Sequence, residues 1–237
     1  MRLFLILILI GFNFSLLSQS DDEINLKFIE NSEWNNKGKL YSYGNLLIFQ
    51  KKGVFKEEFA GEGGCEFYGI YNIVDSKLVL KLNAKQSCES EIKPEKERSC
   101  SIRIANDDPF YNKALVCNSM PYYHNQFLKS YNEIIEINGI KAEIIKERVV
   151  KTDVNLKIRE KPEIESSYYK CLIEGRDYDF MPKGSRFRIF ARTIEKIEIN
   201  GNTDYWYYVE PILDWYSGCS DGKKYVNRAW AFGAFFK

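Results

Sequence analysis

The six cysteines are the residues of this sequence with the clearest capacity for chemistry, because thiols either bind metal ions or form disulfides. None of them shows the close Cys-x-x-Cys spacing of zinc ribbons, and the sequence contains a single histidine, His124. This pattern favours disulfides over a metal site. We expect neither a bound metal nor a cofactor.

Hairpin geometry predicts which cysteines pair. Residues that face each other across an antiparallel hairpin have residue numbers with a constant sum. One turn is expected at residues 75–76 and another at residues 108–109, where Asp-Ser and Asp-Pro stand between apolar runs. The pairs expected from these turns are Cys65 with Cys88 and Cys100 with Cys117.

Catalytic chemistry has little support among the remaining polar residues. Cysteine peptidases, amidases and zinc peptidases all need histidine, and His124 stands alone beside two tyrosines. Adjacent acidic residues occur at positions 21–22, 57–58 and 107–108. Neighbouring carboxylates on a strand point to opposite faces, and those in loops are usually solvated. The run from Glu91 to Arg98 is typical of an exposed charged loop. We therefore expect no enzyme.

Residues 1–20 have the composition of a secretory signal peptide. A basic residue at position 2 precedes the apolar run Leu3 to Ile10, and Ser18 and Ser20 suit cleavage after residue 20. A membrane-spanning helix would need roughly 17–25 apolar residues, more than this run provides. We expect a secreted or periplasmic protein with no membrane span after cleavage. Such compartments permit disulfides. The sequence predicts neither which of these two compartments holds the protein nor its oligomeric state.

The overall composition indicates an all-β protein. Aromatic residues make up 15% of the chain, and short runs of β-branched and aromatic residues alternate with turn residues. With 34 basic and 33 acidic residues, the chain has no basic field of the kind that attracts nucleic acid. We therefore do not expect nucleic acid as a partner.

The turn pattern divides the mature chain into two parts. Residues 21–131 are expected to form a disulfide-linked antiparallel barrel or sandwich, and residues 149–237 a small barrel. Residues 132–148 are expected to form a bridging β-hairpin, because Asn138-Gly139 suits a two-residue turn.

The first part contains an alternating strand, a tight turn and a leucine-alternating return strand. Phe67, Gly69 and Tyr71 lie on one face of the first strand, and Leu78 and Leu80 on one face of the second. This meander weakly resembles a lipocalin-like barrel, which implies small-ligand binding. The alternative is a barrel or sandwich filled by its own side chains.

The last third resembles the bacterial Src-homology-3-like (SH3-like) domain. The matching elements are an Asn-Leu-x-Ile-Arg-x-x-Pro run at residues 155–162, a Lys-Gly turn at 183–184, Trp-Tyr-Tyr-Val at 206–209 and Ala-Trp-Ala at 229–231. Alanines stand where this family usually has glycine and valine, and residues 211–228 form a long insertion. The two long loops each carry a cysteine, so Cys171 is expected to pair with Cys219.

The resemblance implies binding of a peptide, of peptidoglycan or of a host protein. The family pattern turns Tyr207 and Val209 inward and so predicts that Trp206 and Tyr208 are exposed. With the aromatic residues of the two long loops they would form a groove, or they would instead pack under those loops. The candidate ligand-binding residues are Tyr168, Tyr169, Trp206, Tyr208, Trp215 and Tyr216.

We therefore expect an exported, non-catalytic binding protein. Two alternatives are a structural or envelope-organising protein without a discrete ligand, and a protein whose N-terminal barrel binds a small ligand. The sequence does not distinguish among the ligands that the resemblance implies.

Overall fold

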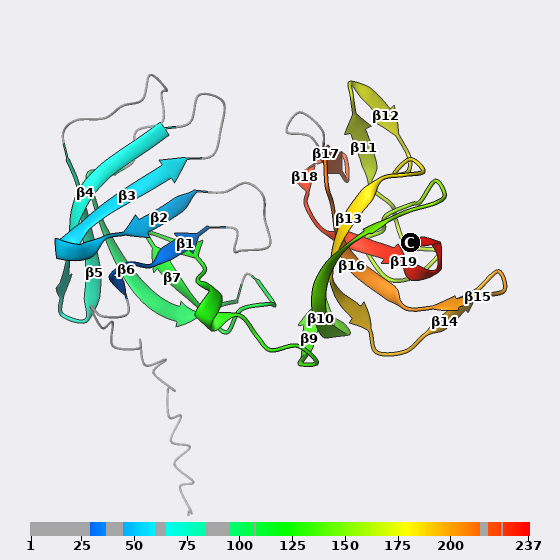
Figure 1. Cartoon of the computed structure of the whole chain (residues 1–237), viewed down its shortest axis with the longest axis horizontal. Coiled ribbons are helices and arrows are strands. Elements are labelled where there is room, and N and C mark those ends of the chain that lie inside the picture. The colour runs from blue at the N-terminus through cyan, green and yellow to red at the C-terminus, as the bar shows by residue number, and fades with distance from the viewer. Residues whose placement is uncertain are drawn as a thin grey trace, which may run out of the picture.

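The protein is all-β, as predicted (Figure 1). The computed structural model describes residues 29–36, 45–59, 65–83, 95–106, 108–213, 218–223 and 225–237. The predicted signal peptide, residues 1–20, lies outside these ranges. None of the helices in the described ranges is long and apolar enough to cross a membrane.

The first eight strands form one antiparallel sheet in chain order. They are β1 (Glu33–Asn35), β2 (Leu46–Phe49), β3 (Val54–Phe59), β4 (Cys65–Val74), β5 (Lys77–Leu82), β6 (Glu97–Ile104), β7 (Lys113–Cys117) and β8 (Met120–Tyr122). Reciprocal backbone hydrogen bonds of 2.8 and 3.1 Å join Asn35 to Tyr123 and bring the two ends of the sheet together. The sheet is thus a nearly closed barrel. The short 3-10 helices η1 (Lys51–Gly53) and η2 (Asn125–Phe127) flank it.

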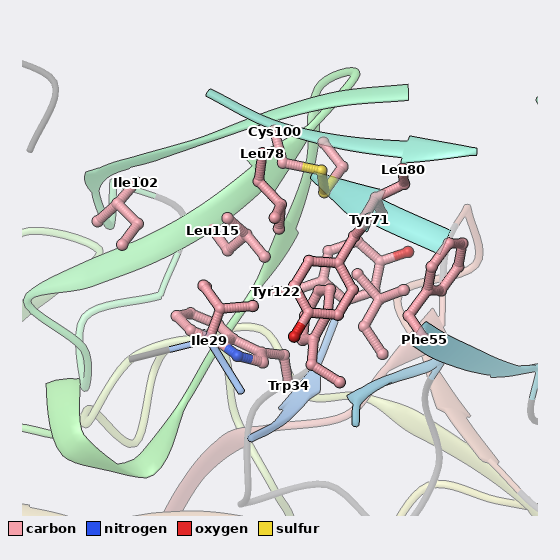
Figure 2. Packing of buried hydrophobic residues seen from close by; sticks show 13 residues of the cluster. Ile29, Trp34, Phe55, Tyr71, Leu78, Leu80, Cys100, Ile102, Leu115 and Tyr122 are labelled. Carbon is pink, nitrogen blue, oxygen red and sulfur yellow. A yellow bond between two sulfur atoms is a disulfide. The ribbon is translucent and has the colours of Figure 1, made fainter. Parts of the chain in front are cut away.

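Alternation along the strands fills the inside of the barrel with large apolar side chains. Trp34, Phe55 and Tyr71 are each at most 1% exposed and converge on the barrel interior (Figure 2). The predicted turn at Asp75-Ser76 is present, with both residues in the left-handed region. A side chain at position 69 would collide with the Phe55 ring, which explains the glycine inside this strand.

The remaining strands form three antiparallel sheets, of five strands (β19-β16-β13-β10-β9), four strands (β12-β11-β17-β18) and two strands (β14-β15). Their bounds are β9 (Ile134–Ile137), β10 (Ile140–Lys151), β11 (Lys170–Ile173), β12 (Arg176–Tyr178), β13 (Arg186–Thr193), β14 (Ile197–Ile199), β15 (Asn202–Asp204), β16 (Trp206–Pro211), β17 (Gly218–Ser220), β18 (Tyr225–Val226) and β19 (Ala229–Phe232). A 3-10 helix, η3 (Gly233–Phe235), follows β19. We refer to β9 through η3 as the C-terminal part.

The hairpin predicted around Asn138-Gly139 is present as β9 and β10. Its second strand continues to Lys151 and pairs with β13 along most of its length. The hairpin is therefore an integral part of the five-stranded sheet. The boundary placed at residue 149 falls inside β10, which means that a fragment starting there would lose most of this strand.

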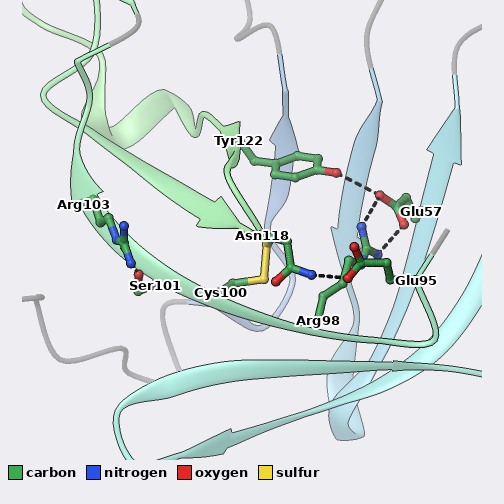
Figure 3. The surroundings of a disulfide bond; sticks show 9 residues. Glu57, Glu95, Arg98, Cys100, Ser101, Arg103, Asn118 and Tyr122 are labelled. Atoms are coloured by element: carbon green, nitrogen blue, oxygen red, sulfur yellow. Dashed lines mark hydrogen bonds and ion pairs between the residues drawn. A yellow bond between two sulfur atoms is a disulfide. The ribbon is translucent and has the colours of Figure 1, made fainter.

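Two predicted disulfides are confirmed. Cys100 and Cys117 face each other on β6 and β7, with their Cα atoms 4.1 Å apart (Figure 3). Cys171 and Cys219 face each other on β11 and β17 at a Cα separation of 3.9 Å. Cys65 is also disulfide-bonded, while its predicted partner Cys88 lies outside the described residues.

Non-reducing peptide mapping is expected to recover three linked peptides, with Cys65 joined to Cys88 as the third. The physical reason is the register of the β4–β5 hairpin, which directs Cys65 toward the segment that follows β5. A peptide linking Cys65 to any other cysteine would contradict this assignment.

Candidate functional site

The aromatic residues predicted to form one exposed groove lie in different environments. Trp206 is only 3% exposed and packs against Phe232, with ring centroids 5.6 Å apart. Tyr208 is half-buried and contacts the Trp230 ring at 5.1 Å. The prediction that Trp206 and Tyr208 are exposed is therefore wrong. Trp215 and Tyr216 lie outside the described residues.

The five-stranded sheet is covered on both faces, which is the physical reason for this correction. Tyr207 and Val209 point into one core, as the strand alternation predicted. Trp206 points into a second core on the opposite face. That second core also contains Phe110 and Tyr111, which come from the connection between β6 and β7 of the barrel. The face expected to bind a ligand is instead the contact between the barrel and the C-terminal part.

Phe110 is the central aromatic residue of this contact. Its ring stacks on Tyr208 at 6.2 Å with an interplanar angle of 19°, and meets the Phe190 ring edge-on at 6.0 Å. The guanidinium carbon of Arg228 lies 5.1 Å from the Phe110 ring and 4.9 Å from the Phe190 ring. One aromatic side chain of the barrel thus contacts three residues of the C-terminal part.

A buried ion pair accompanies these rings. Arg228 Nη1 lies 3.5 Å from Asp108 Oδ2, and both side chains are less than 10% exposed. The backbone N–H of Phe110 donates to Asp108 Oδ1 at 2.9 Å. Burial raises the pKa of the Asp108 carboxyl, and the charge of Arg228 opposes this rise.

Asp108 is expected to titrate above the ordinary range of aspartate carboxyl groups. A raised pKa in the folded state means that the folded protein holds this proton more tightly than the unfolded chain does. The stabilisation from protonating Asp108 is therefore complete below the pKa of the unfolded state and is lost as the pH rises through the raised pKa. Carboxyl-detected NMR titration measures this directly. A midpoint in the ordinary range would mean that the charge of Arg228 fully offsets the effect of burial.

Tyr168 and Tyr169 lie on opposite sides of the segment that leads into β11. Tyr169 packs against the core that contains Cys171, whereas Tyr168 is half-buried on the other side. The ammonium nitrogen of Lys157 lies 3.8 Å from the centre of the Tyr168 ring, a cation–π contact. Burial raises the pKa of Tyr169, and the nearby charges of Glu160 and Asp221 raise it further.

Tyr225 is an exposed aromatic residue that the sequence analysis missed. It is 75% exposed on β18, and a side chain at position 218 would collide with its ring, so the ring lies over Gly218. Strand register places Tyr225 beside Ser220, and Ser220 beside Lys170. Its position in a polar, charged loop after Asp221-Gly222 is the signal that could have indicated exposure.

These residues form one side of the four-stranded sheet. Alternation along the strands turns Cys171 and Cys219 toward the core and leaves their neighbours on the opposite side. The Cys171–Cys219 disulfide holds β11 against β17 beneath it. We define the outer sheet surface as Tyr168, Lys170, Leu172, Ser220 and Tyr225.

A polar cluster lies inside the barrel. It includes Arg98, which the sequence predicted to lie in an exposed loop. Arg98 Nη1 donates to Glu57 Oε1 at 2.9 Å, and Arg98 Nη2 donates to the second carboxylate oxygen (Figure 3). The Tyr122 hydroxyl also donates to Glu57 Oε1 at 2.9 Å. Glu57 is fully buried and Arg98 is 9% exposed, so Arg98 belongs to β6 rather than to an exposed loop. Burial, followed by the Glu57 charge, raises the pKa of Tyr122.

His124 has a local structural role. Its Nδ1 accepts a hydrogen bond from the backbone N–H of Gln126 at 3.3 Å, which caps η2. Its ring lies 5.1 Å from that of Trp34. Burial lowers its pKa. Within the described ranges, no group of three or more histidine, cysteine or acidic side chains is arranged to hold a metal ion.

Comparison with protein-family models, curated proteins and solved structures found no match to this chain. Functional inference therefore depends on the geometry of the sites described above.

Proposed function

We propose that this chain is an exported binding protein without enzymatic activity, and that it binds its ligand through the outer sheet surface. The observation that carries this proposal is the exposed ring of Tyr225, which lies over Gly218, while the half-buried ring of Tyr168 contacts Lys157. Aromatic side chains that are already ordered supply contact area at a small cost in conformational entropy.

The proposed ligand is a peptide, the peptide portion of peptidoglycan, or a host protein. The resemblance of residues 155–231 to SH3-like domains supports this class. The surface combines two aromatic rings with the lysine side chains at positions 157 and 170, and the Lys170 ammonium lies 3.9 Å from Asp179 Oδ1. Such a mixture suits a partner with both apolar and acidic groups.

Two alternatives place no ligand on the outer sheet surface. A structural or envelope-organising protein would bind no discrete ligand. Small-ligand binding inside the lipocalin-like barrel is disfavoured by Trp34, Phe49 and Tyr71, which are fully buried there, and by the Glu57–Arg98 pair that occupies the interior.

Binding of the purified protein to purified peptidoglycan and to immobilised extracellular-matrix protein tests the proposal. Tyr225→Ala and Tyr168→Ala should each weaken binding about tenfold or more, because truncating an aromatic anchor removes its contact area. Tyr131→Ala is the matched control, because Tyr131 is 56% exposed and belongs to the connection between η2 and β9, outside the four-stranded sheet.

The outcomes separate binding at the outer sheet surface from the absence of a macromolecular ligand. Equal binding by the wild type and by both tyrosine variants would exclude the outer sheet surface. Failure of the wild type to bind either material would favour the structural alternative. The melting temperature should be close to that of the wild type in each variant, since these side chains lie outside the three cores.

A further inference from the structure

An exposed apolar strip runs along β4 on the outer face of the barrel. Tyr68, Ile70 and Val74 are 40%, 46% and 52% exposed and all point away from the core. The half-buried Val54 lies opposite Ile70, and the half-buried Val79 lies on β5 opposite Asn72. Contiguous apolar surface of this kind marks a contact site for another macromolecule. We call Val54, Tyr68, Ile70, Val74 and Val79 the β4 strip.

Ion pairs border the β4 strip. Lys56 Nζ lies 2.6 Å from carboxylate oxygens of both Glu58 and Glu66. On the other side of the strip, Lys81 pairs with Glu97 at 3.2 Å. Lys81 and Glu97 balance each other, and Lys56, Glu58 and Glu66 together carry one excess negative charge, so the border has none of the excess positive charge that nucleic acid or an anionic membrane requires. An apolar centre with a polar rim is the anatomy of a protein–protein interface.

The two ends of the strip carry opposite charge. Beyond Tyr68, Glu58 and Glu66 share one lysine, Lys56, among the described residues. Toward the other end, the exposed charged residues are Asp75 and Lys77, at the turn after Val74, and Lys51 and Lys52 of η1, which adjoins β4 near Tyr71. One end is therefore net acidic and the other net basic.

Ile70 lies midway between these ends, four residues from Glu66 and four from Val74. A second copy can be related to the first by a two-fold axis that lies in the contact plane, perpendicular to the strands, and passes through Ile70. The lysine end of the second copy then faces the carboxylate end of the first. The same operation places Ile70 against Ile70. Two-fold interfaces are self-complementary in this way, and complementary charge favours the correct register.

We propose that the protein forms a two-fold symmetric dimer through the β4 strip. Strands β3, β4 and β5 lie on the side of the barrel away from the C-terminal part (Figure 1), and Tyr68, Ile70 and Val74 of β4 are exposed. This dimer leaves the outer sheet surface of each copy accessible, because that surface lies in the C-terminal part.

Sedimentation equilibrium from about 1 to about 500 µM tests the proposal, because small interfaces commonly dissociate in this range. We expect a reversible monomer–dimer equilibrium. Ile70→Lys should raise the dissociation constant about tenfold or more, because it places two ammonium groups at the centre of the contact. Ile134→Lys is the control, since Ile134 is 53% exposed on β9 of the other sheet, and it should leave the dissociation constant unchanged.

Crosslinking tests the symmetry. Ile70→Cys treated with a short bis-maleimide should give a covalent dimer, whereas Ile134→Cys should not. Both lysine variants should keep the melting temperature of the wild type, because both side chains are exposed. A protein that remains monomeric at the highest concentration would overturn the proposal. So would a dimer that Ile70→Lys does not weaken, or crosslinking at position 134 alone.

Discussion

Glu57→Gln is expected to lower the free energy of unfolding by about 3–5 kcal/mol, because it leaves the buried guanidinium of Arg98 without a counter-charge. Urea unfolding followed by tryptophan fluorescence measures this loss, with Trp34 reporting from the same core. Glu58→Gln is the matched control on the adjacent residue. Its ion pair with Lys56 is partly exposed, so the expected loss is about 0–1 kcal/mol.

Removing both charges should cost less than removing one. Arg98→Met combined with Glu57→Gln is expected to recover a large part of the stability lost by Glu57→Gln alone, because no unpaired charge then stays buried. Equal losses for the variants at positions 57 and 58 would mean that Glu57 is accessible to water. The interior polar cluster would then be disproved.

Phe110→Ala should also cost about 3–5 kcal/mol, because it leaves a cavity between the barrel and the C-terminal part. Its second expected effect is on cooperativity. The wild type should unfold in one thermal transition, since both parts contribute to a shared core. Loss of the Phe110 ring should separate this transition into two.

Differential scanning calorimetry measures both effects. Tyr131→Ala provides the control, because Tyr131 is 56% exposed and its truncation should change stability by about 0.5 kcal/mol or less. A single transition at the wild-type temperature in Phe110→Ala would show that this ring does not couple the two parts.

Local patterns were sufficient to predict much of the fold. The turns at residues 75–76 and 138–139 and the pairing of Cys100 with Cys117 are all present. Each depends on residues close together in the chain, where strand alternation and turn composition determine the register. The hairpin at residues 132–148 was predicted only as a bridge between two domains, whereas β10 is a strand of the five-stranded sheet. The composition of the hairpin does not reveal that β10 pairs with β13.

Arg98 illustrates what a local pattern cannot reveal. It ends a run of lysines and glutamates, which predicted an exposed loop. Closure of the barrel brings it to Glu57, 41 residues earlier in the chain, and the carboxylate compensates for its burial. Long-range partners of this kind have no signature in the surrounding sequence.

The sequence by itself determined the all-β class, the principal turns and the Cys100–Cys117 disulfide, because these follow from interactions between neighbouring residues or adjacent strands. The Cys171–Cys219 disulfide followed from the count of cysteines, because each of the two long loops carries one. Only the tertiary structure decided which aromatic residues are accessible. Alternation in β16 separates Trp206 and Tyr208 from Tyr207 and Val209, but it does not say what covers each face. Phe110, from a distant strand connection, covers the face of Tyr208, because burying both aromatic surfaces against each other removes them from water.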